Sequence, residues 1–221
     1  MKIAIIILCL FLTCCTEQNK TNIDGKEIKS YYDNGQIKTK ITVKNDKKNG
    51  PMITYFENGD ISVSGFFKDD ARDKKWTFYD ETTHKITAIE NYVSNVLEGE
   101  QFYYYPDGTL KLKGSYKNNQ RIGFWEQYTP DGKLEVQNIF LEGKDTINVA
   151  IYQSNGKILC SGAAKNDLRE GIWQYFDTDG ILLYDVTYEK GIRNGEWRAY
   201  DKNGKILVTG YYIDGKIIGL E

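Results

Sequence analysis

Histidine, cysteine and proline are scarce in this sequence, and the scarcity of the first two excludes several kinds of catalytic and metal site. There are three prolines and one histidine, His84, and Cys160 is the one cysteine beyond residue 15. A nucleophile with a histidine base and a zinc site of His and Cys ligands therefore have almost no material. We expect no catalytic residues, no metal site and no cofactor, and hence no enzyme. An enzyme built on a pair of carboxylates is the weaker alternative.

An excess of positive charge is also lacking. The chain has 29 Lys and Arg residues against 31 Asp and Glu residues, a net charge of −2, and no basic tract. Binding to nucleic acid depends mainly on clustered positive side chains that neutralise phosphates. The charge pattern therefore excludes nucleic acid as an expected partner.

Long apolar runs are absent except at the N-terminus, where residues 3–12 are all apolar and follow Lys2. A helix of this length spans roughly 15 Å, about half of the hydrocarbon core of a bilayer. It is too short to cross a membrane. A positive residue followed by a short apolar segment is typical of a secretory signal.

The apolar run ends in a sequence that resembles a bacterial lipobox, in which a cysteine becomes the lipidated first residue of the mature protein. Cys15 fits this pattern, with Leu12 three residues before it and Cys14 directly before it. Cys14 is the alternative lipidation site, with Phe11 and Thr13 in those places. A plain cleaved signal peptide or a buried N-terminal strand are the other interpretations.

This interpretation divides the chain into three parts: a signal peptide over residues 1–14, a flexible tether over 15–26 and a repeat array over 27–221. More than one acyl chain on the cysteine would hold the protein stably on a membrane. We therefore expect a lipid-anchored protein of the bacterial cell envelope, on the outer membrane or facing the periplasm if the cell is Gram-negative.

The body of the chain is one unit of about 24 residues written eight times. An Asn-Gly or Asp-Gly dipeptide recurs with its glycine every 24 residues, except for one gap of 49 residues that holds a degenerate copy around Thr83-His84 with one inserted residue. The dipeptides are Asn34-Gly35, Asn58-Gly59, Asp107-Gly108, Asp131-Gly132, Asn155-Gly156, Asp179-Gly180 and Asn203-Gly204. Because β-formers flank each dipeptide, every copy predicts a β-hairpin.

Two repeat positions predict the type of turn. An aromatic residue stands four positions before each turn glycine, as at Tyr128, and Ile or Leu stands two positions after it, as at Leu134. Pro106 and Pro130 favour a type I turn followed by glycine at a left-handed bulge. In such a three-residue loop the aromatic residue lies opposite the aliphatic one, so we expect both to share one buried layer.

Glycine and tryptophan are correlated between repeats. Gly65, Gly114 and Gly162 are each followed eleven residues later by Trp76, Trp125 and Trp173, whereas Val186 and Trp197 are an exception. We expect each indole to lie across the glycine of the adjacent strand, where a Cβ atom would obstruct it.

His84 and Cys160 have simple structural interpretations. His84 takes the place of a turn glycine and is expected to be a solvated turn residue. Cys160 is expected to be a small buried hydrophobe. Its repeat position holds small or medium-sized aliphatic residues in other copies: Val63, Ala88, Leu112, Val136 and Val208.

The copy Gly171–Gly180 (GIWQYFDTDG), with its continuation to Gly195, resembles a MORN repeat. The chain is also similar to the bacterial MORN-variant proteins labelled YwqK-family antitoxins. The resemblance implies an all-β fold, an elongated and twisted antiparallel sheet of about eight successive hairpins without helices. The copies around His84 and over residues 132–147 depart from the pattern, so we expect a bend or a bulge there.

The same resemblance implies a scaffold or protein-interaction module with a protein partner. An immunity or antitoxin-like protein that neutralises a specific toxin is the alternative. The densest aromatic patch, Tyr103, Tyr104, Tyr105 and Tyr128, is the candidate binding site. Tyr103, Tyr105 and Tyr128 form either part of the repeat core or an exposed strip that binds a protein or a glycan.

Overall fold

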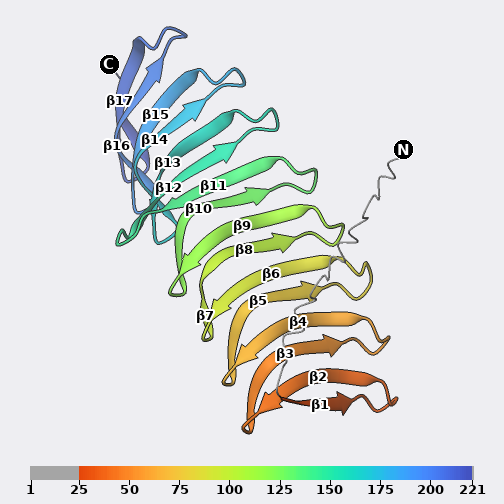
Figure 1. Cartoon of the computed structure of the whole chain (residues 1–221). Helices are drawn as coiled ribbons and strands as arrows, with labels where there is room; N and C mark the ends of the chain where they lie inside the picture. The colour runs from red at the N-terminus through yellow and green to blue at the C-terminus, as the bar shows by residue number, and fades with distance from the viewer. Residues whose placement is uncertain (1–24, 221) are drawn as a thin grey trace, which may run out of the picture.

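The computed structural model describes residues 25–220, which form one antiparallel sheet of 18 strands and confirm the all-β prediction (Figure 1). The strands are β1 (Lys26–Tyr31), β2 (Ile37–Lys44), β3 (Lys47–Tyr55), β4 (Ile61–Lys68), β5 (Ala71–Tyr79), β6 (Ile86–Val93), β7 (Val96–Leu97), β8 (Gly99–Tyr104), β9 (Leu110–Lys117), β10 (Gln120–Tyr128), β11 (Leu134–Phe140), β12 (Thr146–Tyr152), β13 (Ile158–Lys165), β14 (Leu168–Phe176), β15 (Leu182–Glu189), β16 (Ile192–Tyr200), β17 (Ile206–Ile213) and β18 (Lys216–Leu220). Each strand pairs with its neighbours in chain order, and β7 and β8 together occupy one place beside β6. Eight hairpins thus follow one another along an open, twisted sheet. Within residues 25–220 no helix has the length and apolar character needed to span a bilayer.

The loop inside each repeat has the predicted geometry. In the first hairpin, the Gly35 amide donates to the Tyr32 carbonyl at 2.9 Å, and the Tyr32 amide donates to the Gln36 carbonyl at 2.9 Å. Gly35 has a φ of +82°, which is the left-handed bulge conformation. Tyr31 therefore pairs with Ile37, as predicted, and the other hairpins with an Asn-Gly or Asp-Gly turn repeat this register.

The turns between repeats are of a second type. Asn118 and Asn119 both have positive φ, at 51° and 63°, as a two-residue type I′ turn requires. The same pair of positive angles occurs at Asn45-Asp46, Asp69-Asp70, Ser94-Asn95 and Asn166-Asp167. Four of these five pairs consist of Asn and Asp alone, the residues other than glycine that most readily adopt a positive φ, so the sequence does carry a signal for this turn.

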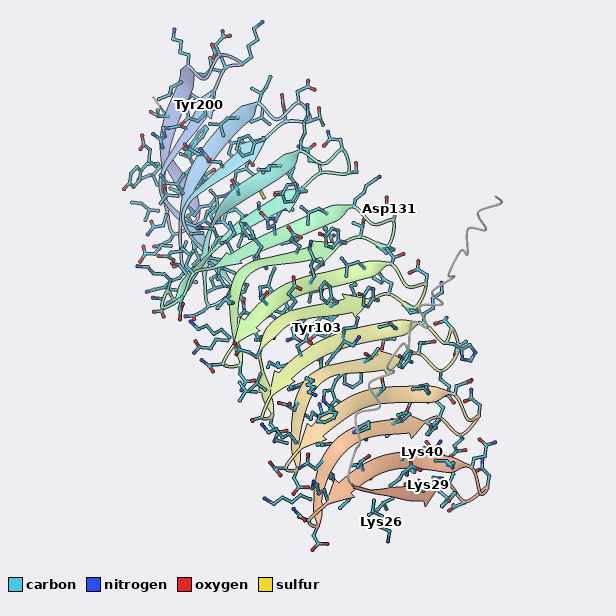
Figure 2. The ribbon with its side chains drawn as sticks, in the orientation of Figure 1. Lys26, Lys29, Lys40, Tyr103, Asp131 and Tyr200 are labelled. Atoms are coloured by element: carbon cyan, nitrogen blue, oxygen red, sulfur yellow. The ribbon has the colours of Figure 1, made fainter. Side chains whose placement is uncertain are left out.

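The two faces of the sheet differ in what they carry. Trp125 and Glu126 are consecutive on β10 and therefore point to opposite faces. We name them the tryptophan face, which carries the four indoles, and the turn-tyrosine face, which carries the aromatic residues next to the hairpin loops. Tyr128 belongs to the second face, because its hydroxyl donates to the Glu126 carboxylate at 2.7 Å. Figure 2 shows Asp131 at a hairpin tip and Tyr200 near the C-terminal end of the array.

The buried core lies on the tryptophan face, which corrects one expectation. The buried apolar side chains are Phe67, Trp76, Trp125, Cys160, Ala164, Trp173, Val186 and Tyr188. The paired aromatic and aliphatic residues beside the loops do share a face, but they are half-buried, and Tyr31 and Ile206 are 57% and 46% exposed. A single-layer sheet has no second layer to cover them. The prediction that they share a face is therefore right, and the prediction that they are buried is wrong.

The two irregular copies behave differently. In the copy around His84 the loop is one residue longer, with the His84 amide bonded to the Asp80 carbonyl at 3.0 Å, and the following strand is interrupted at Glu98 between β7 and β8. The copy over residues 132–147 has no bulge, because β11 and β12 pair without a register shift from Val136 to Phe140. The other ladders between repeats do carry a register shift, and residues 141–145 replace the two-residue turn, so this copy departs from the regular pattern as predicted, although by losing a bulge.

Candidate binding sites

The Gly–Trp prediction is confirmed by the stack at Trp125. A Cβ atom on Gly114 would lie 2.1 Å from Cδ2 of the Trp125 indole, so only glycine fits beneath the ring. The indole N–H donates to the Ser115 carbonyl at 3.1 Å. The Tyr116 ring meets the indole edge to face at 5.0 Å, and the Arg121 guanidinium lies 4.5 Å from its centroid.

The arginine is a member of this stack that sequence reasoning missed. An arginine stands four residues before each tryptophan, at Arg72, Arg121, Arg169 and Arg193. The guanidinium lies within 5 Å of the indole centroid in the first three of these copies. Cation–π contact of this kind is worth about 0.5–1 kcal/mol or more when the pair is sheltered from water. The four-residue spacing in the sequence was a sufficient signal.

A groove of about 450 Å³ crosses the turn-tyrosine face in the middle of the array. Phe102 and Phe124 provide its apolar walls, and Phe124 is 58% exposed. The rest of its lining consists of Gly114 and the polar side chains of Glu100, Lys113, Ser115, Glu126 and Gln137. An exposed aromatic ring beside fixed polar groups is typical of a surface that binds another molecule.

One wall of this groove is held by a hydrogen-bond network around Glu126. Its carboxylate accepts from Lys113 Nζ at 2.8 Å, from the Tyr128 hydroxyl at 2.7 Å and from Gln137 Nε2 at 2.9 Å. The Lys113 hydrogen bond, against the effect of partial burial, lowers the pKa of Glu126, and the Glu126 hydrogen bond raises the pKa of Lys113. Both Glu126 and Lys113 are therefore held in their charged forms at neutral pH.

The predicted tyrosine patch does not form one strip. The Tyr103 hydroxyl lies 3.3 Å from the Glu90 carboxylate on the tryptophan face, and burial raises the Tyr103 pKa above its ordinary value. Tyr105 donates to the Tyr128 carbonyl at 2.8 Å, so these two residues do meet. All three are half-buried, and Tyr128 borders the groove through its bond to Glu126. Their role in binding remains a prediction.

The other singled-out residues have simple surroundings. Cys160 is 3% exposed, and burial raises the pKa of its thiol. The exposed His84 imidazole lies 3.1 Å from the Asp60 carboxylate. No group of three or more His, Cys, Asp or Glu side chains in residues 25–220 is arranged to hold a metal ion. Cys14 and Cys15 lie outside the described residues.

A second cavity lies on the tryptophan face near the C-terminal end of the array. It has a volume of about 270 Å³, and Val186 and Ala199 form its apolar base. Tyr184, Trp197, Tyr212 and Arg193 surround it. Trp197 does not lie over β15, where Val186 replaces glycine, but over Gly210 of β17, where a Cβ atom would lie 2.3 Å from the indole nitrogen.

Two arginines meet at one tyrosine beside this cavity. Arg169 donates to the Tyr188 hydroxyl at 3.2 Å, and Arg193 of the next repeat also hydrogen-bonds to it. Burial would raise the pKa of Tyr188, but hydrogen bonds from Tyr175, Arg193 and Arg169 together lower it. The Tyr175 and Tyr188 hydroxyls are also hydrogen-bonded to each other at 2.9 Å.

The comparisons with known proteins support the repeat and leave the function open. No curated protein matches the chain. The S. aureus TarM structure in complex with fondaparinux, α-GlcNAc-glycerol and UDP is 17% identical with a TM-score of 0.35, over 43% of this chain and 19% of that one. The TcdB2-TccC3 structure is 12% identical with a TM-score of 0.26, over 84% of this chain and 13% of that one. The chain thus spans less than a fifth of either structure, and neither similarity carries an argument about function.

The family comparison is specific. The MORN repeat variant family matches residues 25–45, 48–69, 97–118, 169–190 and 193–214. Each matched segment begins on one strand and extends to the type I′ turn or the turn that replaces it, so the family unit and the observed hairpin coincide. Five of the repeats therefore match the MORN repeat variant family.

Proposed function

We propose that the protein is a non-catalytic, lipid-anchored interaction module of the bacterial cell envelope, with the mid-array groove as its docking surface for a protein partner. The observation that carries the proposal is the groove of about 450 Å³ with the Phe124 ring 58% exposed at its wall. The secretory signal and lipobox-like Cys15 support the location. MORN-variant repeats support a repeat-based interaction module.

The groove has the composition of a protein-binding surface. Exposed aromatic rings supply most of the free energy in protein interfaces, while surrounding polar groups orient the partner. Phe102 and Phe124 can supply the apolar contacts. The Glu126 network holds the polar groups that orient the partner, and these groups do not need to reorganise on binding. Binding to a groove that is already formed costs little conformational entropy.

The test of the docking surface is capture of cross-linked partners from envelope fractions. Replacing Phe124→Glu places a charge on the exposed wall and is expected to abolish capture without loss of thermal stability. Leu207→Glu is the matched control, because Leu207 is 66% exposed and is absent from the groove lining. Equal capture by both variants would contradict the proposed surface.

The test of the anchor is mass spectrometry of the mature N-terminus. Cys15→Ser is expected to abolish the acyl modification and release the protein from membranes, whereas Cys14→Ser is expected to leave it attached. The reverse pattern would assign the lipid to Cys14, and a protein without lipid in its natural form would contradict anchoring altogether.

A further inference from the structure

The cavity above Val186 lies where the regular alternation of indoles breaks down. From β3 to β14, strands at this repeat position alternate between a residue without an indole and a tryptophan: Met52, Trp76, Gln101, Trp125, Val149 and Trp173. Trp197 then follows Trp173 directly. Val186 lies opposite both, paired with Trp173 on one side and Trp197 on the other.

An indole would lie across a glycine at the position of Val186 and would fill the space above it. The valine side chain prevents this, so the space stays open. An indole cannot lie across Val186 as Trp125 lies across Gly114, and Trp197 has moved to Gly210 instead. The indole nitrogen of Trp197 is buried without a hydrogen-bond partner among the described residues, as is that of Trp76, whereas the Trp125 and Trp173 nitrogens are bonded. A buried donor without a partner is destabilising, and the space above Val186 remains open.

The charge around this space is not balanced. Arg193 borders the cavity, and its guanidinium contacts Tyr188 and Tyr212 but no carboxylate of the described residues. Arg169 contacts Tyr175 and Tyr188 and likewise no described carboxylate. By contrast, Arg198 on the opposite face is paired with Asp185 at 3.1 Å. Two guanidiniums on one phenol attract an anion more strongly than one does.

We propose that this cavity binds a small apolar carboxylate, with its hydrocarbon part above Val186 and Ala199 and its carboxylate on Arg193. The volume of about 270 Å³ suits a single ring or a short branched chain. Tyr184, Trp197 and Tyr212 provide aromatic walls for it. The site lies on the tryptophan face and is independent of the groove described above.

The ligand chemistry can come from a free organic acid or from the C-terminus of a partner chain. Calorimetry on the full-length chain with 3-phenylpropanoate tests the first source, and a short peptide with a C-terminal Phe and a free carboxylate tests the second. The peptide binding at least tenfold more tightly identifies a partner chain, and comparable affinities identify a free acid. The neutral amides of both probes are expected to bind at least tenfold more weakly.

Variants separate the site from general stability. Arg193→Gln is expected to weaken carboxylate binding at least tenfold, and Ala199→Leu is expected to abolish it by filling the cavity while it keeps Arg193 in place. Arg72→Gln is the control, because it removes the equivalent guanidinium beside Trp76 and does not line this cavity. Binding of neither acid, equal binding of acid and amide, equal binding of inorganic phosphate, or full binding by Ala199→Leu would each overturn the proposal.

Discussion

Strands that carry an indole and strands that lack one lie on opposite sides of the same glycine and differ in how they pack against it. Gly114 pairs with Gln101 on β8 and also supports the Trp125 indole of β10. Gly65 and Gly162 are likewise each flanked by one tryptophan strand and one strand without an indole, which carries Met52 or Val149. One glycine thus accommodates one indole, and the neighbour on its other side must be narrower.

Gln101 shows how a narrow neighbour is stabilised. The side chain is fully buried, and it accepts from the Asn91 amide at 2.9 Å and donates to the Asn91 and Gly99 carbonyls at 3.2 Å. Its strand is interrupted at Glu98, so backbone groups that a regular ladder would pair are bonded to a side chain instead. Dispersion contacts hold the tryptophan strands, and polar contacts hold this one.

The largest expected effect comes from a Cβ atom under an indole. Gly114→Val would place side-chain atoms within the Trp125 ring, so the indole must leave its site, and we expect a loss of about 4 kcal/mol in unfolding free energy. Denaturant unfolding measures it. Gly219→Val is the control, because no heavy atom lies within 4 Å of a Cβ built there. Equal stability of the two variants would falsify the one-glycine, one-indole rule.

Much of this fold could be predicted from the sequence because the same local features recur in each repeat. The Asn-Gly and Asp-Gly turns, their register and the Gly–Trp contacts follow from local rules, and all were predicted. The alternation of indoles was not, because it depends on what both neighbours of a glycine carry. The groove at Phe124 was also missed, because the residues that line it come from four strands and no single repeat shows them together.

The next effect concerns the strand without an indole. Gln101→Leu keeps the volume similar but leaves the Asn91 amide and carbonyl without their side-chain partner, which predicts a loss of about 2 kcal/mol. Gln127→Leu is the matched control, since Gln127 is exposed and bonds only to the Glu135 carboxylate at 3.0 Å. The comparison is measured by chemical denaturation, and a neutral Gln101→Leu would show that polar contacts do not hold β8.

A smaller effect is expected from the cation above the indole. Arg121→Gln removes the guanidinium 4.5 Å from the Trp125 ring and is expected to cost about 1 kcal/mol, with Arg121→Lys in between. Thermal unfolding and tryptophan fluorescence measure the change. The same substitution in a background that already carries Trp125→Ala should be neutral, and an undiminished cost there would show that the arginine acts elsewhere.

The smallest effect depends on pH and lies on the opposite face. The pKa of Glu126 is lowered in the folded protein, chiefly by Lys113, so the network stabilises the fold above the unfolded pKa of about 4.3 and this contribution is lost as the pH falls through the folded value. Lys113 is 41% exposed, which limits the gain to about 1 kcal/mol or less. Glu126→Gln should therefore be less stable than the natural protein at pH 7, and this difference should shrink as the pH falls below about 4.3 and disappear below the lowered folded pKa. A difference in stability that persists in acid would show that the charge of the Glu126 carboxylate is not what stabilises the groove wall, and that the shape of its side chain is.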